Sequence, residues 1–318
     1  MDPLRPLRAF DRFQQRHPVL AVPVSVLKKF ADDGGGSLSG MIAYRAFFSL
    51  FPLLLLLTAG LGFVLADNPE LREEAVDSVL AQFPVIGEEV RRASLQGSGL
   101  AIAIGVVGSL WAGFGVVVAS ERALDTVWAV PHHDRRDFFT SRLRALLLLS
   151  VLGTLTVAST VASGLVGGGV PLLGTTGSIA FSLAVNLVVF ATVFSLLGSR
   201  QASLRRLLPG VVTAAVCWTL LQLLGGYLVA TQVRNATPTY GTFAVVIGLL
   251  VWLHVSAVVF VLSAELNAVR ARSLWPRSLF GASRQEDQRV FGALARAEAR
   301  DEQERIDVDF TSTRRSGS

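Results

Sequence analysis

The sequence predicts an all-α, polytopic membrane protein with six transmembrane helices and both termini in the cytoplasm. Hydrophobic residues make up 51% of the 318 residues and charged residues only 17%, whereas soluble domains carry about 25% charged residues. Six apolar segments are each long enough for a helix to cross the hydrocarbon layer, which is about 30 Å thick. Arginine and lysine gather in alternate loops, as the positive-inside rule requires of six spans with cytoplasmic ends. The spans are predicted near residues 38–66, 99–128, 142–166, 176–198, 207–231 and 241–270, within a membrane domain of residues 37–272.

Residues 1–36 form a basic segment before the first span. The apolar run in this segment is too short to cross a bilayer, and Pro18 and Pro23 interrupt it. We therefore expect an amphipathic helix that lies on the cytoplasmic surface of the membrane, against lipid headgroups. Residues 273–318 mix acidic and basic side chains with few apolar ones, which predicts a charged, partly disordered cytoplasmic tail.

The first span contains Pro52, where a membrane helix is expected to bend. Arg45 lies about two helical turns inside this span. Its guanidinium group could extend back to the lipid headgroups, or it could pair with an acidic residue inside the bundle. In the following loop, residues 67–98, apolar side chains recur at a spacing of three and four, which predicts a second amphipathic helix. That helix could be a lid over a cavity or a cover on the bundle.

Residues 97–130 form the segment against which we expect the other helices to pack. Ala101, Gly105, Ser109 and Gly113 recur at every fourth position and so form one stripe of small residues along a helix. Such stripes let membrane helices approach each other closely. We expect the stripe to contact other helices of the chain, and small-residue faces of this kind could also join copies into a homo-oligomer.

Charged residues gather near the predicted cytoplasmic ends of the first, second and sixth spans. The set consists of Arg45, Glu121, Arg122, Asp125 and Glu265. Glu121 and Asp125 are four residues apart and share one helix face, from which Arg122 points away. We predict that Arg45 pairs with one of these two acids, with Glu265 as a further acceptor. The cluster is either a structural clamp or an inner gate whose ion pairs break during transport.

Two more polar residues lie within predicted spans, Asn186 and His254. A buried amide needs hydrogen-bond partners, so Asn186 either joins two helices or lines a polar path. His132 and His133 lie in the loop after the second span. Adjacent histidines point in different directions and the sequence contains no second cluster of ligands, so we expect no metal site.

Three groups of residues form a pattern along the chain: Tyr44 and Pro52 in the first group, Trp111 in the second, and Pro209, Gly210, Tyr240, Gly241 and Asn267 in the third. Over roughly residues 20–270, this pattern resembles the YihY/BrkB family of bacterial inner-membrane proteins. The third group is the most specific. The second group departs from the usual family pattern at Asp125, where the family has asparagine.

The resemblance implies a six-helix fold in the bacterial cytoplasmic membrane, with the lipid bilayer as partner, but no established activity. Members have been labelled ribonuclease BN. A metal-dependent nuclease needs clustered His, Asp and Glu ligands and a basic groove in water, and the sequence shows neither. We therefore expect no enzyme, catalytic residue, cofactor or nucleic-acid partner. Two classes stay open: a transporter or flippase-like protein for an amphiphilic or small solute, and a non-transporting envelope or scaffold protein.

Overall fold

A computed structural model describes residues 5–64, 99–167, 175–198, 203–235, 241–279 and 285–310, and these residues form helices without a strand. The all-α prediction is thus confirmed for this part of the chain. The amphipathic helix predicted within residues 67–98 lies outside it. The helices are α1 (Arg5–Arg16), α2 (Pro18–Asp32), α3 (Gly35–Val64), α6 (Gly99–Val127), α7 (Phe138–Gly167), α8 (Thr175–Leu197), α9 (Leu204–Asn235), α10 (Gly241–Ala271) and α11 (Gln285–Ala297), with a short 3-10 turn at His132–Asp134.

Among the residues that the structure describes, five helices are long and apolar enough to cross a membrane. Their apolar spans are Gly35–Leu54, Ala103–Val127, Ile179–Leu197, Leu204–Gly225 and Val246–Ala271. These helices are typical of a multi-pass membrane protein. The third predicted span corresponds to α7, a helix of 30 residues, which is not among the five. The count of six spans and the cytoplasmic location of both termini stay predictions.

The basic N-terminal segment forms two helices rather than one, and the second of them is part of the helical assembly. α2 packs against α10, and Pro18 occupies the first turn of α2, where a proline removes no hydrogen bond that the helix needs. The chain then turns sharply into α3 through Gly34, whose φ of +68° lies in the left-handed region. Glycine adopts this conformation without the steric cost that a Cβ atom brings.

Small residues let α6 approach its neighbours. A Cβ atom added at Gly105 would lie 3.1 Å from the backbone of Leu56 in α3, and one at Gly113 would lie 3.1 Å from the side chain of Leu149 in α7. The prediction that the small-residue stripe contacts other helices is confirmed at these two positions. α6 contacts α3, α7, α8 and α10, while α10 contacts α2, α3, α6 and α9, so α6 and α10 together form the centre of the bundle.

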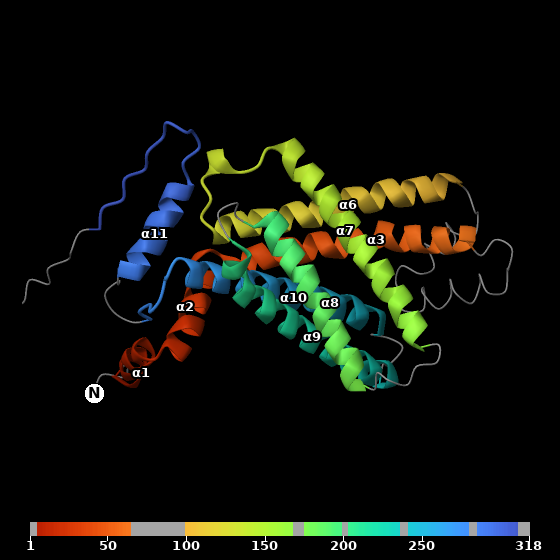
Figure 1. The fold of residues 1–318 in the computed structure, drawn as a ribbon, viewed down its shortest axis with the longest axis horizontal. Coiled ribbons are helices and arrows are strands. Elements are labelled where there is room, and N and C mark those ends of the chain that lie inside the picture. Colours follow the sequence, from red (N-terminus) through yellow and green to blue (C-terminus); the bar gives the residue numbers. More distant parts are fainter. Residues whose placement is uncertain are drawn as a thin grey trace, which may run out of the picture.

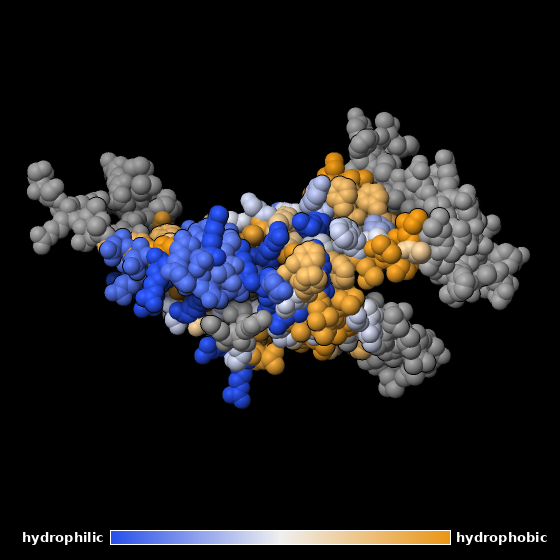
Figure 2. Space-filling model, turned by 90° about the horizontal axis from the view of Figure 1, so that it is seen from above, coloured by the Kyte–Doolittle hydropathy of each residue, from blue (hydrophilic) through white to orange (hydrophobic). Residues whose placement is uncertain are grey.

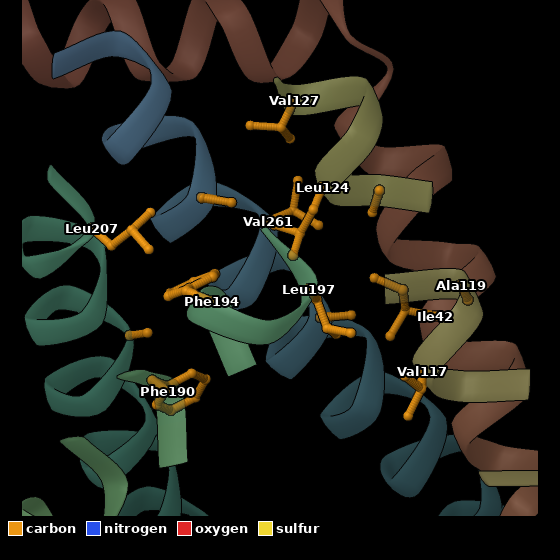
Figure 3. Packing of buried hydrophobic residues seen from close by; sticks show 14 of the residues in the cluster. Ile42, Val117, Ala119, Leu124, Val127, Phe190, Phe194, Leu197, Leu207 and Val261 are labelled. Atoms are coloured by element: carbon orange, nitrogen blue, oxygen red, sulfur yellow. The ribbon is translucent and has the colours of Figure 1, made fainter. Parts of the chain in front are cut away.

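The hydrophobic core is concentrated towards one end of the long helices. Three helices meet there, and the side chains that pack together are each at most 1% exposed (Figure 3): Leu124 of α6, Val261 of α10, and Phe194 and Leu197 of α8. α1, α2 and α11 lie at this same end (Figure 1). Figure 2 shows hydrophilic side chains gathered at this end and apolar side chains over the long helices. The candidate site lies where the packed core meets the hydrophilic end.

Candidate functional site

Lys29 is the centre of a buried charged cluster at the packed end of the bundle. Ala21, Ser25 and Lys29 are four residues apart and therefore lie on one face of α2. All three are at most 3% exposed, because α2 packs against α10. Removing an ammonium group from water costs several kcal/mol unless charged partners surround it, and Lys29 has such partners.

The Lys29 ammonium group contacts two carboxylates and one carbonyl. Its Nζ atom lies 2.9 Å from Oε2 of Glu265 in α10 and forms an i,i+4 ion pair with Asp33. It also donates a hydrogen bond of 2.8 Å to the carbonyl oxygen of Val127 at the end of α6. The side chains of Asp33 and Glu265 are both 0% exposed. Burial raises the pKa of the Asp33 carboxyl above its usual range, although neighbouring Lys29 acts in the opposite direction.

A second ion pair lies between Glu121 of α6 and Arg136 in the loop before α7. Nη1 of Arg136 lies 2.7 Å from Oε1 of Glu121. The same guanidinium group donates hydrogen bonds to the carbonyl oxygens of Leu197 and Gly198 at the C-terminal end of α8. A cation at a helix C-terminus also interacts favourably with the helix dipole. Arg136 thus fastens α6 to α8, and Asp125, one turn beyond Glu121, is 9% exposed.

A cavity of about 230 Å³ opens beside Lys29 and Asp33. Arg272 lies in its wall, donates a hydrogen bond of 2.6 Å to the carbonyl oxygen of Trp128, and stacks over the Trp128 ring at 5.6 Å. Burial lowers the pKa of Arg272, although Asp33 acts in the opposite direction. The cavity wall therefore combines charged and apolar groups. Its lining consists of Lys29, Asp33, Ala129, Arg272 and Leu274 from the bundle, and Arg289, Val290, Ala293 and Leu294 from α11.

Ion pairs hold α11 next to this cavity. Asp287 of α11, fully buried, lies 2.8 Å from Nε of Arg277 and 2.8 Å from Nζ of Lys28. The loop after α6 contacts the end of α11, since ring nitrogens of His132 and His133 lie within hydrogen-bond distance of carbonyl oxygens in residues 297–299. The C-terminal segment, predicted as a charged tail, thus contributes one wall of the site.

The partner predicted for the buried acids was wrong. No ion pair joins Arg45 to a carboxylate within the part of the chain that the structure describes. Its Nη1 atom instead lies beside Gly115 of α6, and its side chain is exposed. The cations that contact Glu121 and Glu265 come from outside the long helices, from Arg136 and Lys29. Arg122 is exposed, away from the Glu121 ion pair, as the sequence predicts.

The two polar residues predicted near the middle of spans have different surroundings. Nδ2 of Asn186 donates hydrogen bonds to Oγ1 of Thr219 at 3.0 Å and Oε1 of Gln222 at 3.2 Å, both in α9. Asn186 therefore joins α8 to α9, which is the first of its two predicted roles. His254 lies exposed on α10, outside the charged cluster.

Motif positions that are far apart in the sequence meet between α9 and α10. The backbone N–H of Gly210 donates a hydrogen bond of 2.7 Å to Oδ1 of Asn267. A Cβ atom at Gly210 would lie 2.2 Å from the carbonyl oxygen of Ser263, so only glycine fits this crossing. Pro209 precedes Gly210 inside α9.

The remaining motif positions lie apart from the charged cluster. Pro52 packs against Gly108 of α6, where an added Cβ atom would lie 2.9 Å from the proline ring. Tyr44 and Trp111 are 63% and 76% exposed. Gly241 begins α10, and Tyr240 lies outside the described residues.

Sequence reasoning missed Lys29, Asp33, Arg136 and Arg272. The sequence places Lys29 and Asp33 in the basic segment expected on the membrane surface, but one signal could have identified them. Small residues at 21 and 25 continue at the same four-residue spacing into Lys29 and Asp33, which places the charges on the face that packs closely. Arg136 and Arg272 have no comparable periodic signal, since both lie beyond helix ends.

Comparisons with known proteins match most of the chain. The family described as "Virulence factor BrkB" matches residues 26–287. A protein of Bacillus subtilis named as ribonuclease-like, YfkH, is 25% identical over 74% of this chain and 90% of its own length. The inner membrane protein YhjD of Escherichia coli is 24% identical over 76% and 78%. A UPF0761 membrane protein of Aromatoleum aromaticum is 28% identical over 70% and 54%. No solved structure matches.

Proposed function

The chain belongs to the BrkB family and is a multi-pass membrane protein, and on this basis we propose that it is a transporter or flippase-like protein of the bacterial inner membrane. Its solute would be small or amphiphilic. We also propose six spans with both termini in the cytoplasm, which puts the charged end of the bundle on the cytoplasmic side. The excess of arginine and lysine in alternate loops supports this orientation.

One observation carries the proposal: a cluster of buried charges at the end of a membrane helix opens onto a cavity. Lys29 and Glu265 are at most 3% exposed, and Lys29 lines the cavity. Replacing a buried ion pair with well-packed hydrophobic residues is often neutral or stabilising, so stability alone is a weak reason to keep such charges. Ionisable groups within membrane helices commonly mark a path for solutes or ions.

The composition of the cavity wall supports an amphiphilic solute. Arg272 and Arg289 contribute positive charge, while Leu274, Val290 and Leu294 contribute apolar surface. Binding pockets usually combine an apolar lining with a few polar groups that orient the ligand. A molecule with an anionic head and a short apolar part matches this wall in charge and hydrophobicity.

Reconstituted vesicles test the proposal. Purified protein is incorporated into liposomes of bacterial lipids, and two rates are measured: flipping of a fluorescent phospholipid and uptake of labelled small organic anions. We expect one of these rates to exceed that of protein-free vesicles. Arg272→Ala should reduce it, whereas His254→Ala, on an exposed face of α10, should not. Rates equal to those of protein-free vesicles in every assay would contradict the proposal.

A non-transporting scaffold is the second candidate, and the Arg136 contacts favour it. Arg136 joins Glu121 of α6 to two carbonyl oxygens at the end of α8, as a static clamp would. We further propose that the chain is not a ribonuclease, although one relative is named as ribonuclease-like. Within the described ranges, no group of three His, Cys, Asp or Glu side chains could hold a metal ion. Incubating the purified protein with RNA and Mg²⁺ or Mn²⁺ tests this, and we expect no cleavage.

A further inference from the structure

We propose that Asp33, Glu265 and Lys29 form a proton-binding site, in which the two carboxyl groups share one exchangeable proton next to the Lys29 ammonium group. Binding of the proton is independent of the proposed transport function. If the chain is a transporter, movement of this proton would drive movement of the solute, and only that coupling rests on the proposed function.

The balance of charge is the first argument. The cluster contains one ammonium group and two carboxyl groups, and the three side chains are between 0% and 4% exposed. With both carboxyl groups ionised, these three side chains would carry one net negative charge away from water, and the nearest further cation, Arg272, donates its hydrogen bond to the Trp128 carbonyl oxygen. Such a charge costs several kcal/mol, and a buried group commonly avoids the cost by changing its protonation state. One proton on either carboxyl group makes the site neutral.

Hydrogen bonding gives the second argument. Both carboxyl groups contact the same ammonium group, Asp33 through Oδ2 and Glu265 through Oε2. An ionised carboxylate can only accept hydrogen bonds, so an oxygen that no donor reaches stays unsatisfied, whereas a protonated carboxyl group can itself donate. Oδ1 of Asp33 and Oε1 of Glu265 are fully buried and receive no N–H or O–H donor from the described chain. Lys29 cannot supply a further donor, because its three N–H groups already contact Asp33, Glu265 and the Val127 carbonyl.

The neighbouring charges act on the ionisation of Asp33 in opposite directions. Asp32 of α2 favours protonation of Asp33. Arg272, which follows α10, faces Asp33 and favours its ionised form. From α6, the carbonyl oxygen of Val127 accepts a hydrogen bond from Lys29. From α11, Arg289 lies in the cavity wall. These charges act in opposite directions on the same carboxyl group.

The cavity provides a route to the site. Lys29 and Asp33 line the cavity, whereas Glu265 lies behind them in α10 with a fully buried side chain. A proton that enters through the cavity therefore reaches Asp33 first and then passes to Glu265, whose carboxyl group contacts the same Lys29 ammonium group. In the proposed orientation this cavity lies on the cytoplasmic side. Glu265 would then be the carboxyl group nearer the membrane interior.

Infrared spectroscopy of the full-length protein in lipid tests the site without any solute. We expect the wild-type protein at neutral pH to show the C=O stretch of a protonated carboxylic acid, with the isotope shift of an exchangeable proton in D₂O. Glu265→Gln should remove this band, because Asp33 then forms a neutral pair with Lys29 and ionises. Asp33→Asn should remove it in the same way. Neither variant leaves an unpaired charge.

Two controls make the assignment specific. Glu121→Gln changes another buried glutamate, one that forms an ion pair with Arg136, and should leave the band unchanged. Asp125→Asn, measured in parallel, shows whether that buried acid contributes to the band. If the wild-type protein has no protonated-carboxyl band at neutral pH, the proposal is overturned, and this result needs no variant. A band that persists unchanged in both Asp33→Asn and Glu265→Gln also overturns it.

Vesicle assays with and without a pH gradient separate this inference from the proposed function. The band together with gradient-dependent transport that Glu265→Gln uncouples supports both proposals. The band without any transport supports the proton site and contradicts the transporter. Transport that ignores the gradient, in a protein without the band, supports the transporter and contradicts the proton site.

Discussion

The two halves of the long helices both carry many apolar residues but differ in how these residues are packed. In α6, Val127 is fully buried while Trp111 is 76% exposed, and in α10 Val261 is fully buried while Ile247 is 59% exposed. The exposed halves present apolar surface of the kind that lipid covers in a membrane protein. Apolar residues alone therefore do not distinguish the packed end from the exposed end. The ion pairs of Lys29 and Arg136 do, because a charge needs a partner where water is excluded.

The largest expected effect comes from removing the cation of the buried cluster. Lys29→Met leaves Asp33 and Glu265 without the ammonium group that contacts both. Breaking a buried ion pair on one side costs about 3–5 kcal/mol. We expect a correspondingly lower thermal unfolding temperature in detergent.

Lys28→Met is the matched control for this change. Lys28 is the adjacent residue and also contacts a carboxylate, Asp287, but its side chain is 24% exposed. We expect a smaller loss of stability from this variant. If Lys29→Met unfolds at the wild-type temperature, the buried cluster does not distinguish the packed end energetically.

A pair of glycines tests the packing difference with a single added methyl group. Gly210→Ala places a Cβ atom 2.2 Å from the Ser263 carbonyl oxygen, whereas Gly248→Ala meets no atom within 4 Å. Overpacking costs about 1–3 kcal/mol, so we expect Gly210→Ala to lower the unfolding temperature. Gly248→Ala should leave it unchanged or raise it, since alanine favours helix by about 1 kcal/mol. Equal responses of the two variants would contradict the comparison.

More of the fold than of the site could be predicted from the sequence. Apolar length and loop charge identify the long helices, because a membrane helix must satisfy its own backbone hydrogen bonds. Two acids of the site, Glu121 and Glu265, were also predicted, since they stand out in apolar surroundings, whereas Asp33 was not. Their partners were not, because Lys29 and Arg136 reach the acids from segments that look like solvated loops. Which cation reaches a buried acid depends on tertiary packing, which sequence spacing within one helix does not encode.

Replacing Asn186, which lies within a predicted span, should have a smaller effect on the stability of the protein. Asn186→Leu removes two hydrogen bonds to α9, and interhelical hydrogen bonds in membrane proteins average about 0.6 kcal/mol with a maximum near 1.7. We expect a loss of stability in this range. His254→Leu, at an exposed position of α10, should cause none. A larger loss from His254→Leu than from Asn186→Leu would show that the exposed face of α10 also packs against a partner.

The smallest expected effect is a difference in pH dependence between a buried and an exposed aspartate. Burial raises the pKa of Asp33 above its usual 3.8, so the stability that it contributes is complete below that value. This stability is lost as the pH rises through the raised pKa. For Asp137, a hydrogen bond from Thr140 lowers the pKa, so its contribution is present above the usual value and lost as the pH falls. Asp33→Asn should therefore flatten the alkaline side of a plot of unfolding temperature against pH, and Asp137→Asn the acid side. If both variants flatten the same side, the burial of Asp33 does not control its ionisation, and the charged cluster is open to water.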